Sequence, residues 1–451
     1  MRKALDLFVS SFGDEYPKAM KCFVKDKDIV TLVRNMIKKV HIMRVISHIL
    51  HFIKRVVKTI LPRKFHEKIR FWVSKGLIAE FSYQRLKSPP FGVNLFIYCA
   101  NSSAGAEGHL LQLALEAANI PYQTIDLHSP EKYKSEIKGK SLFSINLVVC
   151  HAASGTPKRM CLFGIDLKKH YNIGYWAWEL AELPDVFCLG LDIFQEIWTM
   201  SSFCTTTLEK KTTVPVLTVP LYANPDRTVI KNGRDYFNID KDVFMFMFAY
   251  DCNSYVSRKN PQAVVQAFMK AFSPDDGHVG LVLKLAYPER LRNHIEELME
   301  ILSPYRNIYY IDKYLTDNEM RTLLQISDTF VTLHRSEGFG LLPLEAMSLG
   351  TPVISTEWSG NMEYMNHMNT ALVGYNMIPV DGQYVGSTPG DGLVWADPDI
   401  DEAAAHMRRM VSDKAWREKL IANGKYTADE CFNVTTIGKI MHDRVEFLKL
   451  I

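Results

Sequence analysis

The sequence has no long hydrophobic run and no paired cysteines, and we expect no cleavable leader. No stretch of the 451 residues contains the roughly 18 to 20 uncharged apolar residues needed to span a bilayer. The eight cysteines are scattered, with no C-x-x-C pair and no cluster with histidine, which argues against structural zinc and for a reducing compartment. The first residues hold a short apolar run without a small-residue cleavage site after it. We therefore expect a cytoplasmic chain.

The composition is that of a globular protein with an uneven charge distribution. Hydrophobic residues make up 47% and charged residues 23%, and the length allows two or three domains. The net charge of +3 hides an asymmetry, because residues 1–90 carry 20 basic and 7 acidic residues, a balance of +13. The remaining residues carry 33 basic and 43 acidic ones, a balance of −10. Such a split suggests that the two parts contact different partners.

Residues 29–61 are predicted to form one or two basic amphipathic helices. Apolar residues recur at spacings of three and four from Val33 to Ile60, and no acidic residue occurs from 29 to 66. One interpretation is a helical cap whose basic face lies in water. Another is contact of residues 29–75 with an anionic membrane, worth about 1 kcal/mol per basic residue, which would make the protein peripheral on the inner face of the cytoplasmic membrane. No nucleic-acid partner is expected, because no recognisable motif accompanies the charge.

After "SPPFG" at 88–92 the pattern changes to an alternation of strands and helices. "VNLFIYCA" is a short apolar run, as expected for a parallel strand buried on both faces, and a loop of small residues and a helix from about 109 to 118 follow it. Further strands are predicted at "YQTIDL", 142–150, 171–176, 193–198 and 214–219. These elements predict one α/β domain over residues 91–222, preceded by the helical extension of residues 1–90.

A second alternation predicts another α/β domain over residues 223–432. "RKNPQAVVQAFMKAF" supplies Asn260 as an N-cap and Pro261 at the first helical position, while Thr316 and Glu319 form a capping box for a helix at 317–326. Strands are predicted at "VFMFMFAY", 279–285, 307–311, 329–333 and 352–356, and a last helix, at 433–451, could cross back to the first domain. Two such domains are typical of doubly wound halves that bind ligands beyond the carboxyl ends of their strands.

One strand–loop–helix segment, "HRSEGFGLLPLEAMSLGTPVIST" at 334–356, has the features of a ligand site. Gly338 and Gly340 allow the backbone to approach a ligand, and the unpaired N–H groups of the helix start favour a phosphate. Glu337 and Glu345 flank this loop. Because carboxylates repel phosphate, we expect them to accept hydrogen bonds from hydroxyl groups, as in a bound nucleotide sugar.

A second segment, "SRKNP", supplies positive charge for a diphosphate. Arg258 and Lys259 directly precede a helix start, and Lys284 at the end of "LVLK" could extend the same patch. Charge neutralisation there would stabilise a departing nucleoside diphosphate. A solvated loop remains an alternative for Arg258 and Lys259, and a purely structural role remains one for Lys284.

These segments together resemble the retaining nucleotide-sugar glycosyltransferases of family four, which share the two-domain GT-B fold. The residues that carry the resemblance are "SRKNPQAVVQAF", "LVLK" and "HRSEGFGLLPLEAMSLGTPVISTEWSGN", in which Glu337 and Glu345 match the family's E-x7-E pair. "WADPDIDEAAAHMRRM" fits the same group, and the first half matches more loosely through "YNIGYWAWELAELP" and its glycine loop. The resemblance covers about 95–440, and it implies an α/β GT-B fold with two Rossmann-like domains facing across a cleft.

The resemblance implies roles on the donor side. Glu337 would contact the transferred sugar, Glu345 the ribose, and Arg258 with Lys259 the diphosphate. The backbone amides that would approach the phosphates or sugar are those of Gly338, Phe339, Gly340 and Leu341, and the loop near Tyr314 would hold the base. Many family members carry an arginine five residues before the lysine, where this chain has Ser254, so Arg258 would substitute for it.

On the acceptor side the resemblance points to Gly105, Gly108 and His151, with His151 near the reacting centre. Trp178 and Glu179, together with Trp176, could line the acceptor cleft, because aromatic faces suit sugar rings. A packed histidine and core tryptophans are the structural alternatives. No D-x-D metal site is present, and "DPDID" is interpreted as helix capping. No metal or other cofactor is expected, because the cationic patch would take that role.

The implied reaction moves a hexosyl or deoxyhexosyl group from a nucleotide-sugar donor to a glycan or lipid-linked saccharide acceptor, with the anomeric configuration retained. Bacterial family members with similar segments commonly build surface polysaccharides such as O-antigen or capsule. The donor phosphate would take the acceptor proton, so neither glutamate acts as a general acid. The alternatives are a catalytically silent, membrane-docked nucleotide-binding scaffold and, more remotely, a glycosidase, which needs a carboxylic acid of raised pKa.

Overall fold

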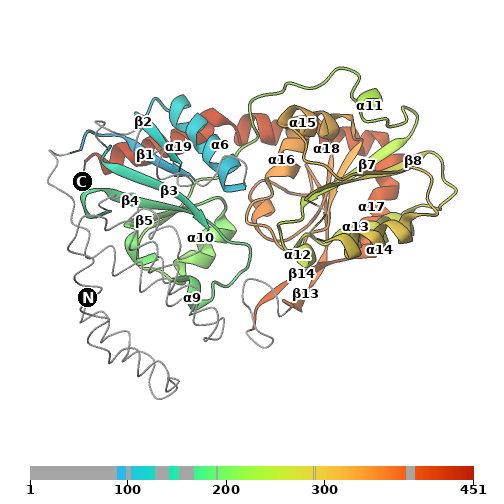
Figure 1. The fold of residues 1–451 in the computed structure, drawn as a ribbon, viewed down its shortest axis with the longest axis horizontal. Helices are drawn as coiled ribbons and strands as arrows, with labels where there is room; N and C mark the ends of the chain where they lie inside the picture. The colour runs from blue at the N-terminus through green and yellow to red at the C-terminus, as the bar shows by residue number, and fades with distance from the viewer. Residues whose placement is uncertain are drawn as a thin grey trace, which may run out of the picture.

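The computed structural model describes residues 89–97, 103–126, 142–151, 167–188, 191–287, 289, 291–381 and 392–450. Two domains lie side by side, each built on a six-stranded parallel sheet with helices packed against it (Figure 1). The predicted α/β class with two doubly wound domains is confirmed. The basic helices predicted within residues 29–75 lie outside the described residues, so they and their membrane contact stay predictions.

The first sheet has the strand order β2-β1-β3-β4-β5-β6, and all its pairs are parallel. Its strands are β1 (Val93–Ile97), β2 (Tyr122–Asp126), β3 (Ile145–His151), β4 (Tyr171–Ala177), β5 (Glu196–Thr199) and β6 (Val216–Thr218). The described helices of this domain are α6 (Ser103–Ala117), α9 (Asp185–Cys188) and α10 (Ser202–Glu209). Helix α6 starts earlier than predicted and packs on β1 and β3. The apolar runs form buried strands because helices cover the sheet. Neighbouring strands supply hydrogen-bond partners for the backbone N–H and C=O groups of each strand.

A ladder of buried amides sets the register of the first sheet. Asn94 donates to Asn146 Oδ1 at 2.8 Å, Asn146 donates to Asn172 Oδ1 at 2.9 Å, and Asn172 donates to Gln195 Oε1 at 3.0 Å. These asparagines are aligned across β1, β3 and β4. A slip of one residue would turn every amide to the opposite face and leave it without a partner, so the ladder allows one register.

The second sheet has the order β12-β11-β10-β7-β8-β9. Its strands are β7 (Phe244–Asp251), β8 (Val279–Ala286), β9 (Ile308–Ile311), β10 (Thr329–Thr332), β11 (Val353–Thr356) and β12 (Ala371–Val373). One face packs against α13 (Pro261–Ala271), α14 (Arg292–Leu302) and α17 (Ile400–Ser412). The other packs against α15 (Asp317–Ile326) and α16 (Leu341–Ser348), and α18 (Lys414–Tyr426) packs on α16 (Figure 1). Two short helices, α11 (Gly233–Tyr236) and α12 (Val256–Lys259), precede β7 and α13 respectively.

Local signals set several helix starts. Thr316 and Glu319 form the predicted capping box of α15, Pro261 opens α13, and Asp399 caps α17 by accepting from two backbone N–H groups. Asn260 holds the predicted N-cap position of α13, but its side chain does not cap the helix. Asn260 precedes α13 with a φ of 53°, and its buried side chain donates to Leu333 O at 3.0 Å instead of accepting from the helix, because it joins this turn to the end of β10.

Two elements of the C-terminal half pack on the first domain. The last helix, α19 (Val434–Leu448), lies against α6 (Figure 1), and Arg444 makes a 2.5 Å ion pair with the fully buried Glu196 of β5. The hairpin of β13 (Tyr375–Pro379) and β14 (Val394–Pro398), which we did not predict, places Trp395 in one apolar cluster with Trp176 and Trp178. The two domains therefore share packed side chains as well as the chain connection.

Candidate functional site

The ends of strands from both domains meet at the loop that follows β10. Ser336 donates through its hydroxyl to Glu179 O, beyond the end of β4 in the first domain. Ser201, which follows β5, donates through its hydroxyl to Gly338 O at 2.6 Å. A Cβ on Gly338 would lie 3.3 Å from Trp178 O, so the small residue permits this close approach of the domains. The segment with the predicted ligand features is therefore held by both domains.

Glu337, Arg258 and Lys259 form one ion cluster at this place, in which Arg258 is buried and the other two are partly buried. The Glu337 carboxylate accepts from Arg258 Nη1 at 3.0 Å and makes a direct ion pair with Lys259 Nζ. Arg258 Nη2 also lies 3.5 Å from Glu179 Oε1 of the first domain. The structure thus brings together four of the predicted site residues, and it rules out a solvated loop for Arg258, which is 6% exposed.

The charges of this cluster favour an ionised Glu337. Burial alone would raise the pKa of Glu337, but the attraction of Lys259 and Arg258 outweighs it and holds that pKa well below its usual range. Burial lowers the pKa of Lys259, and Glu337 acts in the opposite direction. Glu337 is therefore a hydrogen-bond acceptor at neutral pH and has no proton to give.

His334 is a neutral neighbour of the cluster that sequence reasoning left out. It is 1% exposed, and burial lowers its pKa to about 4, although Glu337 pulls that pKa upward. Lys259 and Arg258 add to the lowering. At neutral pH its imidazole therefore brings no charge to the cluster.

Glu345, the second glutamate of the motif, has a different environment. It lies on α16, where burial raises the pKa of its carboxyl to about 7, against the attraction of Arg321. Within the part of the chain that the structure describes, no basic group forms an ion pair with it. The two glutamates therefore differ in charge state near neutral pH, a difference that their spacing does not reveal.

Within the described residues, no hydrogen bond or ion pair joins Lys284 or Tyr314 to the ion cluster. Lys284 is 7% exposed in β8, burial lowers its pKa, and the charged group that opposes this is Asp251. The prediction that Lys284 extends the same cationic patch stays a prediction. Tyr314 is 60% exposed, with its ring centroid 6.2 Å from that of Tyr287, and its contact with a base stays a prediction.

The segment after β11, "WSGN", supports the glutamate loop. It belongs to the residues that carry the family resemblance, but the sequence assigned it no role. Glu337 N donates to Ser359 Oγ at 2.8 Å, and Gly360 N donates to Glu337 O at 2.8 Å. A Cβ on Gly360 would lie 1.9 Å from Gly338 O. The one available signal was this glycine after a predicted strand, which marks a close backbone approach.

The remaining loop residues have structural roles. Gly340 precedes α16 with a φ of 81°, and its carbonyl accepts from the Tyr364 hydroxyl. Phe339 is 2% exposed, with its ring centroid 5.1 Å from that of Tyr364, while Leu341 opens α16 and is partly buried. Their predicted approach to a ligand concerns backbone amides and stays a prediction.

The predicted acceptor residues are only partly supported. A Cβ on Gly108 would lie 2.3 Å from a methyl of Ile97, so this glycine serves helix–strand packing, and Gly105 is buried in the first turn of α6. Trp178 is 3% exposed and donates to Glu182 O, which makes it a core residue and corrects its predicted place along the cleft. Only the backbone of His151, at the end of β3, is described, so its predicted role stays open.

The described residues offer no candidate for a metal site or a membrane-spanning helix. No group of three or more histidine, cysteine or acidic residues there could hold a metal ion. In the same parts of the chain, no helix combines the length and the apolar character needed to cross a membrane.

Comparison with known proteins shows what the chain is similar to. Residues 253–427 match the family of glycosyl transferases group 1. The chain is 24% identical over 208 residues to an uncharacterized glycosyltransferase of Methanocaldococcus jannaschii, covering 46% of each chain. It is 33% identical over 118 residues to the N-acetyl-alpha-D-glucosaminyl L-malate synthase of Bacillus anthracis, covering 26% of this chain and 28% of that one. The O-antigen chain mannosyltransferase B of Escherichia coli is 31% identical over 112 residues, covering 25% and 23%. These matches span less than half the length of each relative.

Solved structures with the same fold cover most of the chain. Sucrose-phosphate synthase from Thermosynechococcus elongatus superposes with a TM-score of 0.59 at 15% identity, covering 80% of this chain and 99% of that one. Anabaena HepE in complex with UDP and glucose superposes with a TM-score of 0.57 at 13% identity, covering 79% and 100%. The chain therefore has the two-domain GT-B fold, and its residues 253–427 are the part that matches the glycosyl transferases group 1.

Proposed function

We propose that this protein is a retaining glycosyltransferase that moves a hexosyl or deoxyhexosyl group from a nucleotide sugar to a glycan or a lipid-linked saccharide. The observation that carries the proposal is the partly buried cluster of Glu337, Arg258 and Lys259, which lies where the strand ends of the two domains meet. It combines two cations with one ionised acceptor. Those are the groups needed to bind a diphosphate next to a sugar hydroxyl.

The cations would act mainly on the leaving group. When the bond between sugar and diphosphate breaks, negative charge grows on the departing phosphate oxygens, and buried cations stabilise that charge strongly. Without a donor, Arg258 and Lys259 are held in place by Glu337. A bound diphosphate would take over part of their hydrogen bonding and free the Glu337 carboxylate to accept from a hydroxyl of the sugar.

The charge state of Glu337 favours transfer over hydrolysis. A glycosidase needs a carboxylic acid that protonates the leaving group, and the lowered pKa of Glu337 excludes it from that role. Glu345, with a pKa raised to about 7, is the glutamate of the pair that would suit a general acid. Hydrolysis of simple glycosides is therefore the second reaction to test.

Relatives and structural neighbours support the choice of substrates. The HepE structure holds UDP and glucose, which supports a nucleotide-sugar donor. The mannosyltransferase of Escherichia coli is named for the O-antigen chain, which supports a role in bacterial surface polysaccharide synthesis. Independence from metal, and attachment to the inner face of the membrane through the basic N-terminal segment, belong to the same proposal.

The first experiment identifies the donor. The full chain is screened by thermal shift with UDP, GDP, ADP, CMP, dTDP and their sugars, because a ligand at about 100 times its Kd stabilises the folded state by about 2.7 kcal/mol. Turnover of the stabilising donor is then measured with saccharide acceptors, with and without EDTA. Binding without turnover would favour the silent scaffold, and cleavage of nitrophenyl glycosides without use of any donor would favour the glycosidase.

The second experiment ties turnover to the cluster. Lys259→Met should lower kcat by about 100-fold to 1,000-fold, because a buried donor aimed at developing charge is lost. Lys439→Met is the matched control, since Lys439 is a 73% exposed lysine on α19 that also pairs with a carboxylate. Equal turnover of these two variants would contradict the proposed role of the cluster.

A further inference from the structure

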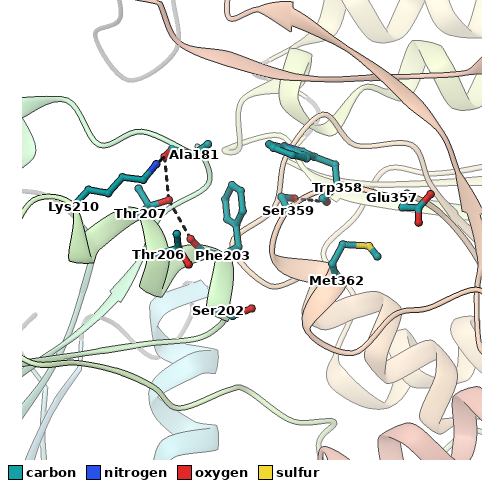
Figure 2. A pocket seen from close by; sticks show the side chains of 10 residues that line it. All are labelled: Ala181, Ser202, Phe203, Thr206, Thr207, Lys210, Glu357, Trp358, Ser359 and Met362. Carbon is teal, nitrogen blue, oxygen red and sulfur yellow. Dashed lines mark hydrogen bonds between the residues drawn. The ribbon is translucent and has the colours of Figure 1, made fainter.

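A cavity between the domains is not explained by the donor site. It has a volume of about 420 Å³, and Figure 2 shows the side chains around it. One wall comes from α10 and the loop before α9, and the other comes from the segment that follows β11. The lining residues are Ala181, Ser202, Phe203, Thr206, Thr207, Lys210, Glu357, Trp358, Ser359 and Met362.

Two aromatic side chains meet in this cavity from opposite domains. The Phe203 and Trp358 ring centroids are 5.7 Å apart with an interplanar angle of 76°, and both residues are partly buried. Aromatic faces carry negative charge density and attract the weakly positive C–H groups of a sugar ring. The Trp358 Nε1 donor is buried and has no hydrogen-bond partner among the described residues, so a ligand oxygen could satisfy it.

The polar groups of the cavity suit a neutral ligand. Ser202 and Thr206 are exposed on α10, and their hydroxyls have no hydrogen-bond partner in the described parts of the chain. Lys210 is already paired with Glu182 at 2.9 Å, which neutralises its charge. Hydroxyl donors and acceptors beside aromatic rings, without an unpaired cation, match a carbohydrate better than a phosphate group.

Both walls of the cavity connect directly to the ion cluster. Ser359 accepts from Glu337 N at 2.8 Å, so the wall that carries Trp358 is bonded to the glutamate loop. On the other side, Ala181 follows two residues after Glu179, whose carboxylate lies 3.5 Å from Arg258. The cavity walls and the ion cluster are thus parts of one connected structure.

We propose that this cavity binds a sugar ring of the acceptor glycan, stacked on Phe203 and Trp358 and hydrogen-bonded to Ser202, Thr206 and Trp358 Nε1. The proposal rests on the proposed function, because it takes an acceptor glycan as the ligand. Ligand pockets have volumes of about 300–1,000 Å³, so this one fits a mono- or disaccharide unit of a longer acceptor. Since the two walls belong to different domains, occupancy would also hold the domains in their present arrangement.

The test uses mannobiose and maltose as probes and glycerol as a non-cyclic polyol control. Binding to the full chain is followed by tryptophan fluorescence and by saturation-transfer NMR. Phe203→Ala should weaken disaccharide binding by about tenfold, which is the loss of one stacked ring. Thr206→Val, an exposed and nearly isosteric change, should weaken disaccharide binding less than Phe203→Ala does. This second variant keeps the test valid if Phe203→Ala fails to fold. Tyr426→Ala removes a 65% exposed aromatic ring outside the cavity and should leave binding unchanged.

The outcomes separate this proposal from the proposed function. In transfer assays, Phe203→Ala and Thr206→Val should raise the KM for the acceptor and leave donor affinity unchanged. Disaccharide binding that is lost in Phe203→Ala, in a protein that turns over no donor, would support the cavity and contradict the transferase. Normal donor turnover with an unchanged acceptor KM in both variants would overturn the cavity assignment, as would equal disaccharide binding by all variants.

Discussion

Replacing Glu345 by glutamine tests the buried state of the second motif glutamate. Burial raises the pKa of this carboxyl to about 7 in the folded protein, whereas its ordinary value is 4.5. A tenfold change in an ionisation constant corresponds to about 1.4 kcal/mol, so the two values differ by about 3 kcal/mol. That is the amount by which ionisation of Glu345 should destabilise the fold at a pH well above 7.

The sign of the effect follows from proton binding. Between pH 4.5 and about 7 the folded state holds a proton on Glu345 that the unfolded state has released, so stability falls as the pH rises through this window. Below the window both states are protonated and the contribution is fully present. Glu345→Gln is neutral at every pH. The variant should therefore lose this pH dependence and exceed the wild type in stability at pH 8 by up to about 3 kcal/mol.

Hydrogen exchange of the α16 amides is the suitable assay. It reports the local free energy of unfolding and does not require both domains to unfold together. Glu418→Gln, at a carboxylate that is 62% exposed on α18, is the control and should follow the wild type at every pH. If Glu345→Gln and the wild type gave parallel curves from pH 5 to pH 8, the proposed burial of the Glu345 charge would be refuted.

The same titration predicts how donor affinity depends on pH. An ionised Glu345 accepts hydrogen bonds from ribose hydroxyls more strongly than a protonated one. Affinity for the nucleotide should therefore rise as the pH increases through about 7 in the wild type, and stay flat in Glu345→Gln. Isothermal titration with the nucleotide found in the donor screen measures both, and an equal slope for the two proteins would contradict the ribose contact.

Three further substitutions test contacts that hold the site and the domains. Arg444→Ala should destabilise the first domain by about 3–5 kcal/mol in urea unfolding, because it leaves the fully buried Glu196 without its ion pair; an exposed substitution such as Lys439→Ala should not. Gly360→Ala should abolish turnover, because the new Cβ would lie 1.9 Å from Gly338 O and displace the glutamate loop. An unchanged kcat of this variant would show that the loop is not held rigidly. Asn146→Ala should cost about 1–3 kcal/mol for each amide left without a partner, measured by thermal unfolding, and Asn146→Gln should not restore the ladder.

Features that depend on neighbouring residues could be predicted from the sequence. Buried parallel strands appear as apolar runs, and the capping box of Thr316 and Glu319 depends on contacts three residues apart. The glutamate motif also depends on residues close together in the chain, since strand, loop and helix follow one another within 334–356. For these reasons the α/β fold with two doubly wound domains, most of its elements and the strand–loop–helix order of 334–356 were predicted correctly, while donor binding by that loop stays a prediction.

Features that join distant residues were decided by the tertiary structure alone. Glu337 and Arg258 are 79 positions apart, and only folding turned two predicted ligand groups into an ion cluster. The interdomain cavity lies between α10 and the segment after β11, and its rings meet only because both domains pack at this boundary. Apolar periodicity shows that a face is buried but not which element covers it.

The two motif glutamates show which properties the sequence determined and which the tertiary structure decided. The sequence determined that two carboxylates flank a glycine-rich loop, because their spacing is a property of the chain itself. Only the tertiary structure decided that Glu337 is paired with cations while Glu345 is buried without an ion-pair partner among the described residues. The reason is that a pKa depends on burial and on nearby charges, and both are supplied by parts of the chain that folding brings together.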